Sequence, residues 1–406
     1  FLDLFFIEPS DDAYNDAILV EAIEASDRVY VETVLADDFP PPSAEDEFFQ
    51  RHEVLFENLG RIDDVRGEWW KMRTHFGLEP PLQPYGRVAA GYGHANFDQD
   101  WDAVFRRQPL VAKVSRLVDR IRLDELSPST SVDVEGYERL AWVDRDGIYH
   151  HIEHPITEQS LDELRERMEA SAPAERVDTD NDGEIDEEYY LVRRFHDQFI
   201  PSITLSLALE YFNKDYDDLE IVLGEQITIP DVEVYDPQTD EWGPYYVPIS
   251  FAETDTEGNV VEEAEYRLVE DVVIPINEDG EMLINYMGPR SSPSRDGHQT
   301  FPIRSYAAYT GRGVVGPDPS TWRPTRAADN KILMVGPFSS GMAEDEKFTP
   351  YGLMYGVEIH ANALNTIIMD RFLRHAPFWM DLAILVGAVL LTAVVAGTLR
   401  NPLWSF

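Results

Sequence analysis

A run of alternating carboxylates near the middle of the chain has the spacing of a calcium-binding loop. In Asp178-Thr-Asp-Asn-Asp-Gly-Glu-Ile-Asp186, the acids at positions one, three and five can converge on one hard cation, and Gly183 permits the sharp turn. Position twelve is Tyr189, so a bidentate ligand has to come from the preceding acid. The candidate calcium ligands are Asp178, Asp180, Asp182, Glu184, Asp186 and Glu188. A bound calcium ion would stabilise the insertion 172–190 and would not be the ligand that is sensed. The alternative is an acidic turn that binds water and no ion.

A second polar group follows a short apolar segment, 331–335, which is expected to be a buried strand. It continues as Gly336-Pro-Phe-Ser-Ser-Gly341. Open α/β sheets bind ligands in loops at the carboxyl ends of their strands. The candidate ligand-binding residues here are Ser339, Ser340, Asp345 and Thr349. The loop lacks the Lys-Ser/Thr of a nucleotide P-loop, which argues against a phosphate site. The alternative is that Asp345 and Thr349 fix the loop through hydrogen bonds to its backbone.

His360 and Asn362 stand just inside a predicted helix, 357–371, that leads toward the C-terminus. Side chains at these positions can hydrogen-bond the preceding loop, so that a movement of the loop on ligand binding reaches the helix. The alternative is that both are packing residues whose hydrogen bonds are satisfied inside the core.

No constellation of catalytic residues emerges. His150, His151 and His154 suggest a metal site, but on a strand His151 points away from the other two, so the three cannot easily meet. The sequence has no G-x-S-x-G elbow and no cysteine, which excludes thiol chemistry, thiolate zinc sites and disulfides. The interpretation is a chain that is not an enzyme and needs no cofactor other than the candidate calcium ion.

The charge balance limits the partners. The 406 residues carry 77 Asp and Glu against 33 Lys and Arg, a net charge of −44. Such a field repels nucleic acid and anionic lipid headgroups. Only five of the cations are lysines, and an acidic, lysine-poor surface is consistent with a saline habitat. No nucleic-acid partner is expected.

The segment Leu382–Leu399 reads LAILVGAVLLTAVVAGTL and contains no charged residue. Apolar runs of about this length can span a bilayer as a helix. Trp379 and Trp404 flank it as interfacial anchors would. The expectation is a transmembrane helix over 377–400 whose partner is the lipid bilayer. Arginines lie on both sides of it and do not settle its orientation.

The rest of the pattern predicts one α/β body. The opening run Phe1–Ile7 reads as a strand, 15–26 as a helix and 29–35 as a second strand, the unit from which parallel sheets are built. Further helices are expected at 43–59, 160–170 and 203–212, a hairpin at 140–152 and short strands at 219–223, 226–229, 272–276 and 282–286. The predicted fold class is α/β, a mainly parallel sheet flanked by helices. The acidic stretches 172–190 and 231–270 are read as surface insertions.

Several motifs resemble, in order, those of the second family of CHASE-type domains, the sensory extracellular domains associated with cyclases and histidine kinases. The motifs are Phe1-Leu-Asp3-Leu-Phe-Phe6, Gly93-His-Ala-Asn-Phe-Asp98 with Arg106-Arg-Gln-Pro-Leu110, Pro201-Ser-Ile-Thr-Leu-Ser-Leu-Ala208, Leu283-Ile-Asn-Tyr-Met-Gly-Pro289, Phe301-Pro-Ile-Arg-Ser-Tyr306, and Gly356-Val-Glu-Ile-His-Ala-Asn362. The resemblance covers residues 1–376. The acidic insertions depart from the family pattern.

The resemblance implies a receptor input domain on the outer face of the bacterial inner membrane. It implies an extracytoplasmic sensory domain over 1–376, a membrane helix over 377–400 and the start of a following loop at 401–406. An N-terminal strand–helix and a cytoplasmic nucleotide cyclase or protein kinase would lie outside this sequence. The implied partners are a small-molecule or protein ligand and a second receptor copy, as a homodimer or a larger membrane assembly. The alternative is a membrane-anchored scaffold subunit of a periplasmic or surface assembly; a tethered hydrolase is disfavoured.

Overall fold

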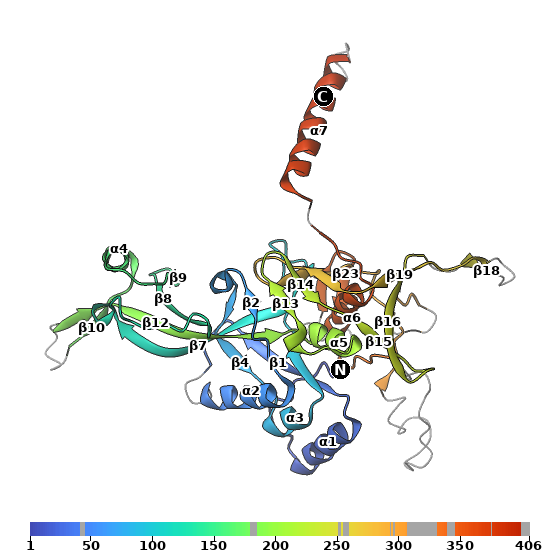
Figure 1. Cartoon of the computed structure of the whole chain (residues 1–406), viewed down its shortest axis with the longest axis horizontal. Helices are drawn as coiled ribbons and strands as arrows, with labels where there is room; N and C mark the ends of the chain where they lie inside the picture. The colour runs from blue at the N-terminus through green and yellow to red at the C-terminus, as the bar shows by residue number, and fades with distance from the viewer. Residues whose placement is uncertain are drawn as a thin grey trace.

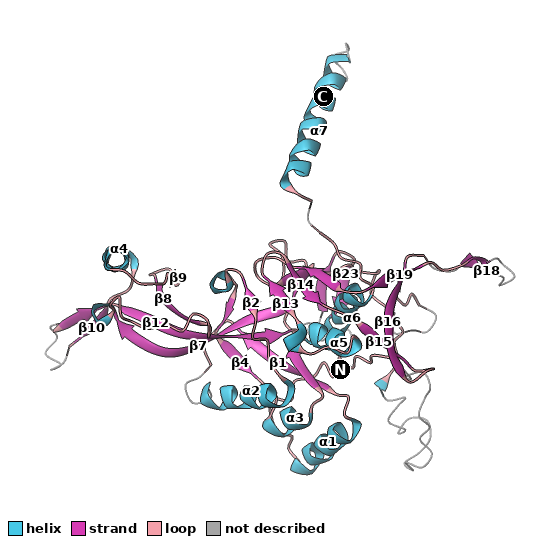
Figure 2. Cartoon of the chain, viewed as in Figure 1, coloured by secondary structure: helices cyan, strands magenta, loops and turns pink. Residues whose placement is uncertain are grey.

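The computed structural model describes residues 1–40, 45–178, 185–250, 253–254, 260–292, 294, 297–306, 331–338, 346–374 and 376–398. In Figure 1 a long β arm extends to one side of a central body, a smaller sheet stands on the other side, and the last helix projects away from the body. Figure 2 shows that strands dominate the arm and the body, with helices clustered below and within the body.

The N-terminal part forms a small sheet with helices on one side. Its elements are α1 (Ala13–Ser26), β1 (Tyr30–Ala36), α2 (Glu45–Leu59), β4 (Gly77–Glu79), α3 (Gln83–Val88) and β5 (Gly91–His94). β1 lies between its neighbours, parallel to β5 and antiparallel to β4. Leu2 forms an isolated parallel bridge with Val335, so the first residues run beside a segment more than three hundred positions away. The expected helix at 15–26 and strand at 29–35 are confirmed as α1 and β1, whereas the strand expected at 1–7 is wrong, because these residues contribute only an isolated bridge.

Two long antiparallel strands build the arm. Its sheet has the order β3 (Thr74–His75), β7 (Val111–Arg122), β12 (Leu191–Pro201), β8 (Glu138–Val143) and β9 (Tyr149–Ile152). α4 (Glu158–Ser171) and the hairpin of β10 (Glu175–Val177) and β11 (Glu187–Tyr189) lie toward its far end (Figure 1). The capping box of α4 is formed by Thr157 and Ser160, so the helix begins before the predicted position.

The central body packs two further sheets around the apolar helix α5 (Ile203–Tyr211). The elements of these sheets are β2 (Val65–Arg66), β13 (Glu220–Val222), β14 (Gln226–Ile229) and β20 (Val272–Pro275), with β6 (Arg107–Pro109) paired to β21 (Glu281–Leu283). Short 3₁₀ turns occupy Trp69–Lys71, Leu123–Glu125 and Tyr216–Asp218. Every residue from Ile203 to Leu209 is buried, which explains why this helix carries no polar stripe.

The acidic stretch 231–270, read from the sequence as an insertion, forms a sheet of its own. It forms β15 (Glu233–Asp236), β16 (Glu241–Pro248) and β19 (Tyr266–Val269), with β17 (Glu253–Thr254) and β18 (Val260–Glu262) beyond them. Tyr245, Val247 and Val269 are buried in the main core, whereas Tyr246 and Leu268 on the opposite face are exposed. The strand period of two therefore gives this sheet one core face and one solvent face.

The C-terminal part consists of a hairpin and two helices. The hairpin joins β22 (Glu346–Thr349) to β23 (Gly352–Tyr355), and α6 (Gly356–Ile368) follows directly and is largely buried. Residues 369–377 then lead to α7 (Phe378–Thr398). The stretch Trp379–Ala396 of α7 is long and apolar enough to cross a membrane, and none of it is buried against the body.

The prediction of a mainly parallel sheet is not supported. In the described part of the chain the parallel strand pairs are β1–β5, β2–β13 and β3–β7, and all other pairs between named strands are antiparallel. Parallel neighbours need a crossover of a dozen or more residues, usually a helix, whereas antiparallel neighbours can be joined by short turns. Much of the chain from Val111 to Leu283 consists of strands joined in this second way, so the fold is mixed α/β.

Candidate functional site

Three side chains with metal-binding groups meet in the interior beside β1. Asp3 lies in the N-terminal segment, where its backbone N–H donates to the Val335 carbonyl at 2.7 Å. Glu32 stands in the middle of β1 and is 1% exposed, and His360 stands on α6 and is 2% exposed. One ligand atom from each of Asp3, Glu32 and His360 lies within 4.8 Å of the others. We call these three residues the acid–histidine cluster.

The His360 ring is enclosed on several sides. Its Nδ1 lies 3.3 Å from Nε2 of the buried Gln108. The ring of Phe97 lies 4.5 Å away between centroids, and the ring of Phe1 meets it edge-on at 5.7 Å. Burial lowers the pKa of His360 to about 3, because the charged imidazolium loses its hydration. The imidazole is therefore neutral at physiological pH.

One face of α6 holds a neighbouring extended segment through a ladder of side chains. Glu358 Oε1 accepts from the Ser291 N–H at 2.9 Å, Asn362 Oδ1 from the Met287 N–H at 2.9 Å, and Thr366 Oγ1 from the Asn285 N–H at 3.0 Å. Positions separated by four share one face of a helix. We call Glu358, Asn362 and Thr366 the α6 ladder; it ties the helix to the segment 285–291, which follows β21.

The start of the segment between α6 and α7 is also held to the body. Asp370 forms an ion pair with Arg267 of β19. The Arg371 guanidinium donates to the Pro248 carbonyl at 3.2 Å, and the Arg371 carbonyl accepts from the Asn285 side chain at 3.0 Å. The point at which the chain leaves the body is therefore fixed to two strands and to the segment beside α6.

The predicted loop site is only partly within the described residues. Ser339, Ser340 and Asp345 lie outside them. Thr349 is buried and closes the turn between β22 and β23: its Oγ1 donates to the Gly352 carbonyl at 2.8 Å and accepts from the Tyr351 N–H at 3.3 Å. That arrangement matches the alternative in which Thr349 fixes the local backbone. His360 belongs to the acid–histidine cluster, and Asn362 belongs to the α6 ladder.

The described ends of the calcium-like segment, Asp178 and residues 185–188, adjoin or belong to strands β10 and β11, which pair at the far end of the arm (Figure 1). Asp180, Asp182 and Glu184 are outside the described residues. The Asp186 N–H donates to the Val177 carbonyl at 2.9 Å, which closes the hairpin beside Asp178. Glu188, half exposed, forms an ion pair with Arg176 at 3.3 Å. Calcium binding by this segment stays a prediction.

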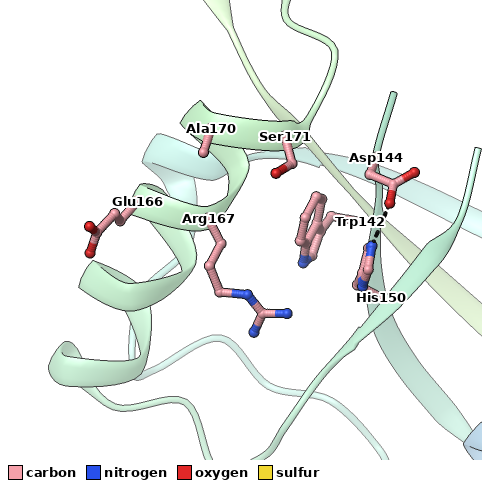
Figure 3. A pocket seen from close by; sticks show the side chains of 7 residues that line it. All are labelled: Trp142, Asp144, His150, Glu166, Arg167, Ala170 and Ser171. Atoms are coloured by element: carbon pink, nitrogen blue, oxygen red, sulfur yellow. Dashed lines mark hydrogen bonds and ion pairs between the residues drawn. The ribbon is translucent and has the colours of Figure 1, made fainter. Parts of the chain in front are cut away.

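A pocket of about 420 Å³ lies between α4 and the β8–β9 hairpin. Figure 3 shows the residues that line it, which are Trp142, Asp144, His150, Glu166, Arg167, Ala170 and Ser171. His150 lies almost parallel to Trp142, with ring centroids 4.3 Å apart, and its Nε2 is 2.8 Å from Asp144 Oδ2. His151 stacks on Trp70 at 5.3 Å, so the two histidines face different rings, as strand alternation predicts.

A buried charge network at the base of the arm has no counterpart in the sequence-based predictions. Arg139 Nε donates to Asp197 Oδ2 at 2.7 Å, and Ser115 bonds both of these side chains. Nearby, Lys113 Nζ donates to the Trp69 and Trp70 carbonyls at 3.0 and 3.1 Å. Burial lowers the pKa of Lys113 to about 7, with the neighbouring Asp197 acting in the opposite direction.

The interior contains further residues that the sequence-based candidates missed. These are Asp3, Glu32 and Gln108 around His360, and Glu358 and Thr366 on the α6 ladder. A signal for them existed: Asp3 and Glu32 are acidic residues inside apolar strand-like runs, and 358, 362 and 366 are polar positions at helical spacing within an apolar helix.

In a comparison with protein families, the CHASE2 domain matches residues 1–397. A comparison with curated proteins gives no match, and neither does a comparison with solved structures. CHASE2 domains are non-catalytic, extracellular sensory domains of membrane signalling receptors. The family match covers the arm, the body, α6 and nearly all of α7, so this chain belongs to the CHASE2 domain family.

Proposed function

We propose that this chain is the ligand-sensing input part of a membrane-bound receptor, anchored by α7, with its body on the extracytoplasmic side of the bacterial inner membrane. A change in the body would pass through α6 and residues 369–377 to α7, and from there to a cytoplasmic nucleotide cyclase or protein kinase. Receptor copies would act as a homodimer or a larger membrane assembly. The loop around Ser339, Ser340, Asp345 and Thr349 remains the ligand site that the sequence motifs predict.

The observation that carries the proposal is the attachment of α6. The α6 ladder joins the helix to the segment 285–291, and Arg371 joins the next residues to Pro248 and Asn285. α6 and the residues that follow it are thus both attached to the segment 285–291. A shift of α6 relative to β1 would therefore move the start of the segment that leads to α7. A ligand produces such a shift only if it binds one arrangement more tightly than the other.

The topology can be tested with single thiols, because these 406 residues contain no cysteine and any cysteine elsewhere in the full-length protein can be replaced by serine. Trp101 is 97% exposed on the body, and Ser405 follows α7 in the sequence. In intact cells that express the full-length protein, a membrane-impermeant maleimide should label the Trp101→Cys variant. It should label the Ser405→Cys variant only after permeabilisation. Labelling of the two variants on the same side, or of Trp101→Cys only after lysis, would overturn the proposed topology.

The signalling step needs a second measurement. Replacement of Arg371 by Lys should keep the positive charge but lose the planar donor geometry that reaches the Pro248 carbonyl. The cyclase or kinase activity of the full-length receptor should then respond less to its stimulus, while membrane insertion stays unchanged. The matched control is Arg374→Lys, three residues further along the same segment. Equal responses in both variants and the unmodified receptor would contradict signal transfer along this path.

A further inference from the structure

The acid–histidine cluster joins three segments that are remote in the sequence and is built from groups that bind metal ions. We propose that Asp3, Glu32 and His360 form a binding site for a divalent transition-metal ion such as Zn²⁺ or Mn²⁺. The binding of the ion stands by itself. Its use as a signal rests on the proposed function, since only a receptor would transmit it.

The geometry is close to that of a metal site. The three ligand atoms lie within 4.8 Å of one another. Oxygen and nitrogen ligands lie about 2.0–2.2 Å from a bound zinc ion, so two ligands of one ion are separated by at most about 4.4 Å. Small side-chain rotations would therefore bring all three groups to one ion. Asp3 is only partly buried, which leaves a side from which an ion can enter.

The donor set selects the class of metal. Imidazole suits zinc, copper, iron and nickel, whereas carboxylates suit magnesium, calcium and manganese. One imidazole with two carboxylates is a set that first-row divalent ions accept, and the sequence has no cysteine that would favour a thiolate-loving ion. Calcium prefers six to eight oxygen ligands, so this site should bind it weakly. Three protein ligands also leave a coordination position for water or a small anion.

Gln108 provides the independent observation. It is fully buried, its Nε2 lies 3.3 Å from His360 Nδ1, and its Oε1 has no hydrogen-bond partner among the described residues. The oxygen and nitrogen of an amide are interchangeable by a half turn of the group. After this turn Oε1 would accept from Nδ1–H, leaving the Nε2 lone pair of His360 for a metal. Metal-ligating histidines usually donate their second N–H to a carbonyl or carboxylate in this manner.

Gly336 positions the first ligand. A Cβ atom on Gly336 would lie 2.6 Å from Asp3 Oδ2 and 3.0 Å from the Cβ of Val357, the second residue of α6. An alanine there would push Asp3 away without changing any ligand. Gly336 is therefore a positioning residue for the cluster, and it lies three residues before the predicted ligand loop at Ser339.

Metal binding would change how α6 sits. Glu32 belongs to β1, Asp3 to the segment beside Val335, and His360 to α6. An ion that draws the three groups together would pull α6 toward β1 and the N-terminal segment. α6 precedes residues 369–377 and α7, so the site lies on the path proposed for the signal.

The test uses the full chain, solubilised, stripped with a chelator and titrated with Zn²⁺ alone and with Mn²⁺ alone. In an Asp180→Asn background, which disables the predicted calcium loop, one ion per chain should bind, and affinity should fall at least tenfold in Glu32→Gln and His360→Gln. Gln108→Leu and Gly336→Ala should weaken binding roughly 10–100-fold, as loss of outer-shell support does. His150→Gln, a histidine on the arm, is the control and should bind as the unmodified chain does. Absence of saturable binding, or an affinity of the Glu32 and His360 variants equal to that of the unmodified chain, would overturn the site.

A spectroscopic measurement guards against variants that fail to fold. Pulsed EPR of the Mn²⁺-loaded unmodified chain should show coupling to one imidazole nitrogen, and its absence would overturn the proposal without recourse to a variant. The two proposals also fail separately. If the chain binds the metal but Trp101→Cys is labelled only from the cytosolic side, the proposed receptor topology is contradicted and the metal site is not. If the chain has the expected topology but binds no metal ion, the metal site is contradicted and the receptor topology is not.

Discussion

Buried polar residues shape this interior at the level of single side chains. His52, Lys113 and His360 are all almost fully buried. Burial removes water from an ionisable group and penalises its charged form, so the pKa of buried His and Lys falls. The consequence is a pH dependence of stability whose direction can be assigned residue by residue.

His52 makes the folded state sensitive to acid. Neither of its ring nitrogens has a hydrogen-bond partner among the described residues, and burial lowers its pKa to about 3. Below about pH 6.5 His52 is protonated in the unfolded chain but stays neutral in the folded chain. The free energy of unfolding therefore decreases as the pH falls from about 6.5 toward 3. His52→Leu should remove this loss, giving an advantage that grows by up to about 1.4 kcal/mol per pH unit below pH 6.5.

Urea unfolding at several pH values between about 7 and 4 measures the effect, with His298→Leu on the exposed surface as the control. A His52→Leu advantage that does not grow as the pH falls would contradict the assignment.

Lys113 should act in the alkaline range. Its pKa in the folded chain is lowered to about 7, against about 10.4 in an unfolded chain. Between these values the unfolded state binds more protons, so this group adds stability as the pH rises. Lys113→Met keeps the length of the side chain and should flatten the rise between about pH 7 and 9.5, by up to a few kcal/mol. Parallel stability curves for the variant and the unmodified chain in urea titrations would refute the role of this lysine.

At the scale of the elements, much of the organisation is readable from the sequence. The helices at 45–59, 203–211 and 356–368, the hairpin at 138–152 and the strand 226–229 lie where periodicity and turn residues predict them. Strand direction is not readable in the same way, because it depends on which strands meet after the chain has folded. The pairing of Leu2 with Val335 and the meeting of Glu32 with His360 join distant segments that no local pattern connects.

The candidate site was therefore found only in part. His360 and Asn362 were selected because they stand at the entry of a helix, and both are buried and hydrogen-bonded, His360 in the acid–histidine cluster and Asn362 in the α6 ladder. Their roles differ, because successive helix positions point in different directions. His360 faces Asp3 and Glu32, and Asn362 faces the segment 285–291.

The α6 ladder should contribute measurably to stability. In Asn362→Leu the shape is nearly kept, but the Met287 N–H loses its acceptor, which should cost about 1–3 kcal/mol. The matched control is Asn365→Leu, a half-buried residue on the same helix, which should cost less. Urea unfolding of the solubilised full chain provides the measurement. Equal losses in both variants would show that the ladder adds no stability of its own.

The β10–β11 hairpin offers a test of the predicted calcium loop. At constant ionic strength, about 1 mM Ca²⁺ should raise the unfolding temperature if the loop binds with the micromolar affinity of sensor sites, a gain of at least about 2.7 kcal/mol at a hundredfold excess over Kd. Asp180→Asn should abolish the gain, and Asp146→Asn, in the turn of the β8–β9 hairpin, should not. An unchanged unfolding temperature would leave the segment as a solvated acidic turn.

At the scale of the whole molecule, the net charge of −44 acts against compactness. Like charges on one surface repel, and the Debye length falls from about 10 Å at 0.1 M salt to about 3 Å at 1 M. Raising NaCl over this range should therefore increase the unfolding temperature by several degrees. Choline chloride should act similarly if screening is the cause. A gain with sodium alone would instead indicate bound cations, and a fall in both salts would contradict the repulsion argument.

The arm has a mechanical consequence. β7 and β12 remain paired from Arg122 and Leu191 near the tip to Val111 and Pro201 at the base, with one irregularity between Arg194 and Phe195. A load applied lengthwise at the tip would run along the two paired backbones and would not open their interstrand hydrogen bonds one by one. The arm would transmit such a load to the start of α5, which begins two residues after Pro201. A force on an arm attached to the cell envelope would therefore reach the centre of the molecule.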